Sequence, residues 1–387
     1  MKNSLFSERL EAISQRGNLR QLPRVEHNGL KISTSKYENM LNLSSNDYLG
    51  LATDEEFTTR FWAEHPEAQS SYPLSSSSSR LLTGNFEIYE RVEARLSQLY
   101  GTEAALIFNS GYHANMGILP AVTTSQSLIL ADKLVHASLI DGIRLSRGKA
   151  VRYRHNDYEQ LEDLLAQHAH LHDIVAVVTE SVFSMDGDTA DLARLVALKS
   201  KYPNVLLYVD EAHAVGAIGE RGLGYSEVCG VTSEIDILVG TFGKALASTG
   251  AFVVCTREIR EWLVNTMRTL IFTTALPPIN LLWTLYVLDN IEAMSARRQH
   301  LARISQQLRD ALGESSQISN SHIIPVIAGE SPRAVAMADQ LQNEGYYILA
   351  IRPPTVPEGT SRLRISLTAT VTQEALERFI PMINSVR

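Results

Sequence analysis

Short apolar runs alternate with amphipathic stretches through the middle of the chain. Residues 174–178 and 205–209 are apolar at every position, a pattern typical of strands covered by helices on both faces. Further candidate strands lie at residues 104–108, 127–130, 150–153, 235–239 and 251–254. The segments between them read as helices. In one of them, apolar residues recur at helical spacing from Tyr89 to Leu99, Asn85 stands where a helix cap is expected, and Gly101 stands where the helix should end. The alternation predicts an α/β fold with a mostly parallel seven-stranded sheet between helices.

The pattern changes after Pro277 and Pro278. A long helical stretch covers residues 280–312, and an apolar run at 322–327, a helix at 334–343, strands near 346–351 and 363–367 and a last helix after Thr372 follow it. This order predicts a smaller α+β domain. We therefore expect an amino-terminal arm at residues 1–45, a large domain at 46–280 and a small carboxyl-terminal domain at 281–387.

Composition narrows the classes of function. The 387 residues are 44% hydrophobic and 20% charged, which is ordinary globular usage and excludes a largely disordered chain. The net charge of −8 disfavours nucleic-acid binding, which usually needs a basic face. Two cysteines, Cys229 and Cys255, cannot supply a disulfide framework or a four-cysteine zinc site, and we expect no metal.

The sequence also bears on where the protein works. No window reaches the roughly 18 apolar residues of a membrane span, and the amino terminus lacks the continuous apolar segment of a secretory signal. We therefore expect a cytoplasmic protein without a membrane partner.

Polar residues follow three of the apolar runs. Residues 205–209 lead to Asp210, 235–239 lead to Thr241 and Lys244, and 104–108 lead to Gly111 and Tyr112. Ligands of open α/β sheets bind beyond the carboxyl ends of the strands, so these residues are candidates for one site. A lysine amine, an acid and a phosphate cradle of hydroxyl and amide groups are what pyridoxal phosphate needs from a protein.

Taken together, the motifs resemble those of the α-oxoamine synthases, pyridoxal phosphate enzymes of fold type I. The motifs are Ser45-Asn-Asp-Tyr-Leu-Gly50, Ser110-Gly-Tyr-His-Ala-Asn115, His136-Ala-Ser138, Thr179-Glu-Ser-Val-Phe-Ser-Met-Asp-Gly187, Asp210-Glu-Ala-His213, Thr241-Phe-Gly-Lys244 and Ala350-Ile-Arg-Pro-Pro-Thr-Val-Pro357. The resemblance runs from about Arg20 to the carboxyl terminus. The last motif and Ser79-Arg-Leu-Leu-Thr-Gly-Asn85 look most like the branch of the family that serves biotin synthesis.

The resemblance implies roles around the cofactor ring. Lys244 would bind the cofactor covalently and act as the base at the amino-acid α-carbon. Asp210 would pair with the pyridine nitrogen, and His136 would lie over the ring and assist at the carbonyl oxygen. His213 and Ser184 would lie near the phenolic oxygen.

It also implies roles at the phosphate and the substrates. Thr241, with Gly111 and Tyr112, would hold the phosphate, and Thr273 or Thr274 would reach the phosphate of a partner subunit in a homodimer. Arg352 would bind the amino-acid carboxylate, a task suited to a planar bidentate donor. Arg20 and Thr355 match positions associated with the substrate.

The implied reaction is the decarboxylative condensation of L-alanine with a pimeloyl thioester, carried by acyl carrier protein or coenzyme A. Two alternatives stay open. One is another α-oxoamine synthase, which uses glycine and an acetyl thioester or makes an acyl ketone. The other is a catalytically silent relative.

One tract departs from the family. The chain has Ser75-Ser-Ser-Ser-Ser79 where these enzymes usually show Gly-Ser-Gly-Gly-Ser. Serine disfavours positive φ, so any of these positions that adopts such an angle carries strain of about 1 kcal/mol or more.

Overall fold

The chain folds as two units in the computed structural model, which describes residues 2–313 and 317–387. The larger unit comprises Leu49–Ser184 and Thr189–Arg298. The smaller unit comprises Met1–Tyr48, Met185–Asp188 and Gln299–Arg387, so the amino-terminal segment belongs to the same unit as the carboxyl-terminal one. The predicted domain boundaries at 45/46 and 280/281 stay predictions.

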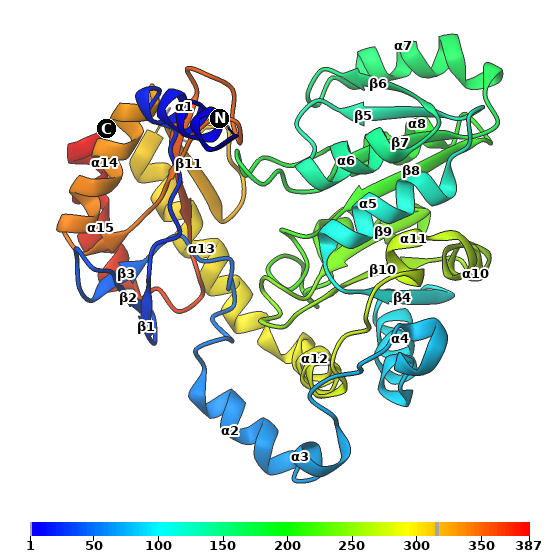
Figure 1. The fold of residues 1–387 in the computed structure, drawn as a ribbon, viewed down its shortest axis with the longest axis horizontal. Helices are drawn as coiled ribbons and strands as arrows, with labels where there is room; N and C mark the ends of the chain where they lie inside the picture. The colour runs from blue at the N-terminus through cyan, green and yellow to red at the C-terminus, as the bar shows by residue number, and fades with distance from the viewer. Residues whose placement is uncertain (1, 314–316) are drawn as a thin grey trace. The chain divides into compact units, whose positions relative to one another are not determined.

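A seven-stranded sheet in the order β4-β10-β9-β8-β7-β5-β6 forms the centre of the larger unit (Figure 1). Its strands are β4 (Ala104–Phe108), β5 (Leu128–Asp132), β6 (Lys149–Tyr153), β7 (Val175–Glu180), β8 (Val205–Asp210), β9 (Ile237–Thr241) and β10 (Ala251–Cys255). Only β10 runs antiparallel to its neighbours in this sheet, and β5 to β9 pair in parallel. The predicted mostly parallel α/β fold is confirmed, and each predicted apolar run overlaps one strand.

Helices cover both faces of this sheet. The helices of the larger unit are α2 (Glu55–Glu64), α3 (Ala68–Ser71), α4 (Glu87–Tyr100), α5 (Gly111–Val122), α6 (Ala137–Leu145), α7 (Tyr158–His168), α8 (Leu192–Lys199), α9 (Tyr225–Cys229), α10 (Arg257–Thr266), α11 (Arg268–Ile271) and α12 (Pro278–Asn290). On one face, Ile118 of α5, Leu139 of α6 and Leu263 of α10 pack in a single buried cluster with Val253 of β10. The next residue back along β10, Phe252, contacts Tyr100 of α4. Because side chains alternate along a strand, α4 covers the opposite face.

The smaller unit contains two small sheets. One has the order β1-β2-β3-β12 and the other β11-β14-β13. Their strands are β1 (Glu26–Asn28), β2 (Lys31–Ser33), β3 (Met40–Asn42), β11 (Ile323–Gly329), β12 (Tyr346–Tyr347), β13 (Ala350–Ile351) and β14 (Ser361–Ser366). The helices are α1 (Lys2–Gln15), α14 (Ser331–Asn343) and α15 (Gln373–Val386), and α13 (Ser295–Leu312) enters from the larger unit. The Thr372 side chain caps α15 by accepting the N–H of Ala375.

Two local predictions are wrong. Asn85 does not cap α4, because its side-chain oxygen accepts a hydrogen bond from Arg80 Nε at 2.9 Å and Phe86 holds the cap position. The helical stretch at 280–312 is not continuous, because a 3₁₀ turn at Glu292–Met294 separates α12 from α13. Within the described residues, no helix combines the length and apolar character that a membrane span requires.

Candidate active site

Four neighbouring strands of the large sheet end in buried polar residues. Asp132 ends β5, Glu180 ends β7, Asp210 ends β8 and Thr241 ends β9. These strands are parallel, so their last residues meet at one edge of the sheet. Burying polar groups is costly unless they have hydrogen-bond partners. A cluster of such groups at one edge of the sheet therefore indicates a functional site.

A cavity of about 170 Å³ opens at this edge, wholly within the larger unit. It is lined by Gly111, Tyr112, Asn115, His136, Ser138, Glu180, Asp210, Ala212, His213, Thr241 and Lys244. The fold therefore brings together seven of the residues singled out in the sequence.

Lys244 reaches the cavity from the turn that follows β9. Its Nζ lies 2.8 Å from Nε2 of His213, which follows β8. The turn is folded back on itself, because Phe242 N donates to Gly250 O and Gly243 N donates to Thr241 Oγ1. These bonds hold the lysine at the edge of the sheet, next to an imidazole that can accept its proton.

Asp210 faces the cavity with two fixed donors. Its Oδ2 accepts from Asn115 Nδ2 at 2.6 Å, and its Oδ1 accepts from the backbone N–H of Ala212 at 2.9 Å. The residue is 5% exposed, and no cationic side chain of the described chain forms an ion pair with it. The site therefore offers a buried, oriented carboxylate that can pair with a cationic group of a bound molecule.

His136 is held by a hydrogen-bonded chain that begins at Asp210. Asn115 Nδ2 also donates to Ser138 Oγ, which lies 2.7 Å from His136 Nδ1. The backbone N–H of Ser138 points to the same Nδ1, so this nitrogen accepts and the ring proton sits on Nε2. Burial, and to a lesser degree the Lys244 charge, lowers the pKa of His136, although Asp210 opposes the shift.

The amides of Gly111 and Tyr112 open helix α5. Ser110 caps this 12-residue helix by accepting the N–H of His113. A Cβ added at Gly111 would find Thr241 Cβ as its neighbour at 3.9 Å. A helix start with free N–H groups beside a threonine hydroxyl is suited to a phosphate group.

The remaining predicted residues do not line the cavity. Ser184 is buried in the larger unit. Thr273 and Thr274 belong to the same unit, and the carbonyl of Thr274 accepts a hydrogen bond from Asn109 Nδ2 at 2.7 Å. Arg20, Arg352 and Thr355 belong to the smaller unit.

Arg20 and Arg352, the two arginines predicted to bind substrate, lie together in the smaller unit. Arg20 donates to the carbonyl of Arg352 at 3.2 Å and to Thr355 Oγ1 at 3.1 Å. Arg352 donates to the carbonyl of Gly17. Burial and the Arg20 charge lower the pKa of Arg352. Two adjacent cations suit an anionic ligand.

Four lining residues were missed as site residues: Asn115, Ser138, Glu180 and Ala212. All four lie inside motifs that the sequence displays. Their positions at strand ends and helix starts were a usable signal, but only the structure shows their side chains or amides facing the cavity.

The tract Ser75-Ser-Ser-Ser-Ser79 lies outside the cavity lining and packs on the chain after Thr274. Ser76 Oγ donates to Ala275 O at 2.6 Å, and Ala275 N donates to Ser78 O. Ser77 has φ of +50°. The expected strain at a glycine-type position is therefore present.

Comparison with known proteins agrees with this geometry. The family model for aminotransferase class I and II matches residues 38–383. The chain belongs to this family. A Glaesserella parasuis protein named "Putative 8-amino-7-oxononanoate synthase" is 57% identical over 95% of this chain and 97% of its own.

Solved structures extend the comparison. A structure of SPT with PLP is 28% identical, has a TM-score of 0.88 and covers 99% of this chain and 96% of that chain. The Francisella tularensis 8-amino-7-oxononanoate synthase is 27% identical, has a TM-score of 0.73 and covers 89% of this chain and 97% of that chain. Membership of the family makes this chain a pyridoxal phosphate-dependent enzyme of the α-oxoamine synthase type, which uses an amino acid and an acyl thioester.

The cavity fits pyridoxal phosphate. Lys244 offers the amine, and the buried Asp210 carboxylate lacks a cationic partner that a pyridinium would supply. Gly111 offers an amide donor to a phosphate, and Thr241, whose hydroxyl donates to Gly250 O at 3.0 Å in this structure, also lines the cavity.

Proposed function

We propose that this enzyme condenses L-alanine with a pimeloyl thioester and releases carbon dioxide, giving 8-amino-7-oxononanoate for biotin synthesis. The observation that carries the proposal is the convergence of Lys244, Asp210 and His136 on one cavity. The name of the 57% identical relative supports the choice of substrates.

Bound pyridoxal phosphate supplies an electron-accepting ring that stabilises negative charge at the α-carbon of the amino acid. Lys244 would hold the cofactor aldehyde through its amine and would then move the proton at the α-carbon. The neighbouring imidazole of His213, 2.8 Å away, takes up a proton from the lysine, so that its amine is nucleophilic. Asp210 keeps a proton on the pyridine nitrogen.

His136 assists at the acyl carbonyl. Because its Nδ1 accepts from Ser138, its Nε2–H is the donor that remains for a carbonyl oxygen. A lowered pKa keeps this imidazole neutral near pH 7, so it acts as a hydrogen-bond donor without adding a positive charge beside Lys244.

Other residues hold the ends of the bound molecules. Gly111, Tyr112 and Thr241 would bind the phosphate. His213 would approach the phenolic oxygen, as would Ser184, although Ser184 does not line the cavity in this structure. A homodimer would bring Thr273 or Thr274 of one subunit to the phosphate of the other.

The smaller unit supplies the groups for anionic substrate. Arg352 would bind the alanine carboxylate, and Arg20 and Thr355 would contact the substrate. Guanidinium groups match carboxylates in geometry and charge.

The test is the mass of the product formed by the full-length enzyme from L-alanine and a pimeloyl thioester. Parallel reactions with the acyl carrier protein and coenzyme A thioesters identify the donor, and glycine replaces alanine as the matched control. We expect a product with the mass of 8-amino-7-oxononanoate when alanine is supplied with the thioester, and no product when glycine replaces alanine. Turnover with glycine but not with alanine would indicate that the enzyme is another α-oxoamine synthase. Cofactor binding without any product would indicate a catalytically silent relative.

We further propose a cytoplasmic homodimer. Size-exclusion chromatography with light scattering of the cofactor-loaded enzyme checks the dimer, because a monomer would deprive the phosphate of the threonine from the partner subunit.

A further inference from the structure

Glu180 is a cavity residue that the proposed mechanism leaves without a task. It ends β7 and is the direct register partner of Asp210, which ends β8. Partners in a parallel register point to the same face of a sheet, so both carboxyl groups face the cavity that they line. Glu180 is 2% exposed, and two adjacent buried carboxylates would repel each other strongly.

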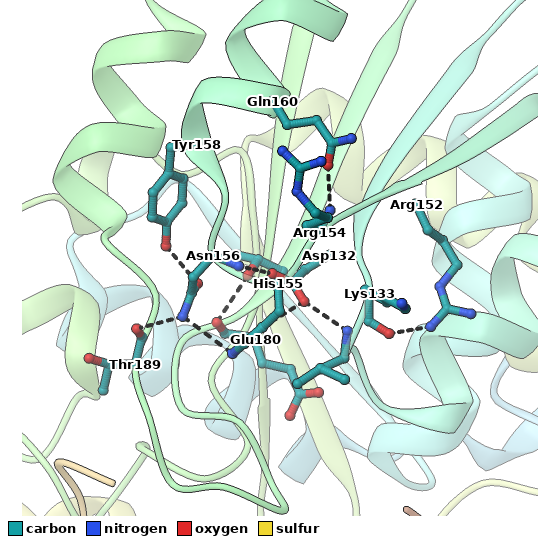
Figure 2. A network of polar contacts seen from close by, with 12 residues as sticks. Asp132, Lys133, Arg152, Arg154, His155, Asn156, Tyr158, Gln160, Glu180 and Thr189 are labelled. Atoms are coloured by element: carbon teal, nitrogen blue, oxygen red, sulfur yellow. Dashed lines mark hydrogen bonds and ion pairs between the residues drawn. The ribbon is translucent and has the colours of Figure 1, made fainter. Parts of the chain in front are cut away.

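The acidic groups at this edge of the sheet differ in the number of hydrogen-bond donors that surround them. Asp132 accepts from His155 Nδ1 at 2.9 Å and from the N–H groups of Leu134 and Asn156, both at 2.8 Å (Figure 2). Asp210 accepts from two N–H groups. Donors of this kind favour the ionised form of a carboxyl group.

Glu180 has fewer donors than either. Its Oε1 is buried and has no hydrogen-bond partner within the described part of the chain. A buried carboxylate without donors is costly, whereas a carboxylic acid carries no charge and can donate its own O–H, so the unpartnered oxygen matches the protonated group.

The charges that face Glu180 give the same answer. Burial raises the pKa of Glu180 well above its usual range, and the Asp210 carboxylate on β8 raises it further. Lys244 after β9 and the N–H of His136 oppose these effects, and Asp132 on β5 adds to them.

We propose that Glu180 is a neutral carboxylic acid that offers its O–H to an acceptor atom of the bound cofactor or substrate, while Asp210 alone carries the negative charge of this wall. The division follows from the unequal donors and from the register that sets the two groups side by side. One negative charge then meets one pyridinium, and the neutral acid satisfies a polar atom of the ligand without altering that balance. The inference depends on the cofactor and not on which amino acid the enzyme condenses.

The first experiment is infrared difference spectroscopy of the full-length protein, with and without pyridoxal phosphate, against the Glu180→Gln variant at pH 7.5. Gln is the matched control because it is neutral, has the same shape and can still donate. We expect the wild type to show the C=O stretching band of a protonated carboxyl group, both with and without pyridoxal phosphate. Glu180→Gln should lack this band under both conditions. Identical spectra in the carboxylic-acid region would overturn the proposal.

The second experiment follows the absorbance of the bound cofactor against pH. Glu180→Gln should bind pyridoxal phosphate within about fivefold of the wild-type affinity, because it changes one hydrogen bond, and its titration should coincide with that of the wild type. Asp210→Asn should displace the titration. A displacement of the same size in Glu180→Gln would mean that Glu180 carries charge, and would refute the inference.

A third measurement does not depend on the folding of the Gln variant. Removal of the neighbouring charge in Asp210→Asn should lower the pKa of Glu180, so the acid band of the cofactor-free protein should disappear at a lower pH than in the wild type. An unchanged band would contradict the coupling of the two groups. No readout requires turnover, so failure here is distinguishable from failure of the proposed reaction.

Discussion

Replacing Ser77 by glycine should stabilise the enzyme, although glycine substitutions usually destabilise. Ser77 has φ of +50°, where a residue with a Cβ atom costs about 1–2 kcal/mol. Glycine removes this cost but adds about 0.5–1 kcal/mol of backbone entropy to the unfolded chain. The hydroxyl contact between Ser75 and Ser77, at 3.1 Å, is exposed and weak. The net expectation is a gain of up to about 1 kcal/mol.

Ser79→Gly is the matched control in the same tract. Ser79 has φ of −75° and ψ of 158° and no side-chain cap hydrogen bond, so its replacement should cost about 0.5–1 kcal/mol. At about 2.1 cal/mol/K per residue, a chain of 387 residues loses roughly 1 °C of Tm per kcal/mol. The two variants should therefore differ by about 0.5–2 °C in calorimetric Tm, at one cofactor concentration. Equal shifts in the same direction would refute the claim of strain at Ser77.

Three further predictions concern the site. Lys244→Ala should keep the circular dichroism spectrum of the fold but lose turnover and the covalent cofactor adduct trapped by borohydride; retained trapping would remove Lys244 as the binding amine. Arg352→Ala should raise the KM for alanine roughly tenfold or more, because a charged hydrogen bond contributes about 1.5–3 kcal/mol, with a smaller change in kcat; an unchanged KM would argue against its carboxylate role. Finally, because burial lowers the pKa of His136 below 6.5, the unfolded state binds more protons at this residue, and stability should fall as the pH drops below about 6.5. Urea midpoints at pH 7.5 and 5.5 should show a smaller loss for His136→Gln than for wild type, and equal losses would contradict this assignment.

The sheet was predictable because its strands are buried on both faces. Apolar residues fill every position of the central runs at 174–178 and 205–209, and the structure places β7 and β8 there. The pairing of the strands was harder to predict from the sequence. The predicted strand at 346–351 divides into β12, which pairs with β3, and β13, which pairs with β14. Nothing in this apolar run marks where the chain passes from one sheet to the other.

The site was predictable in its reactive groups and less so in their supports. Lys244 and Asp210 stand out because an amine and an acid follow apolar runs. Asn115 reads as an interior helix residue, yet it accepts from Tyr208 and donates to Asp210 and Ser138. Such contacts join residues far apart in the sequence, so spacing does not indicate them. The roles assigned to all of these residues stay predictions.

The order in which the chain visits its two units limits how the enzyme can be dissected. The chain passes from one unit to the other at 48/49, 184/185, 188/189 and 298/299. A fragment that begins at Gln299 therefore lacks both Met1–Tyr48 and Met185–Asp188, and a fragment that stops at Arg298 carries these segments without the rest of their unit. Neither half can be excised by a single cut, so truncations at these junctions should yield insoluble or unfolded products instead of separate working modules.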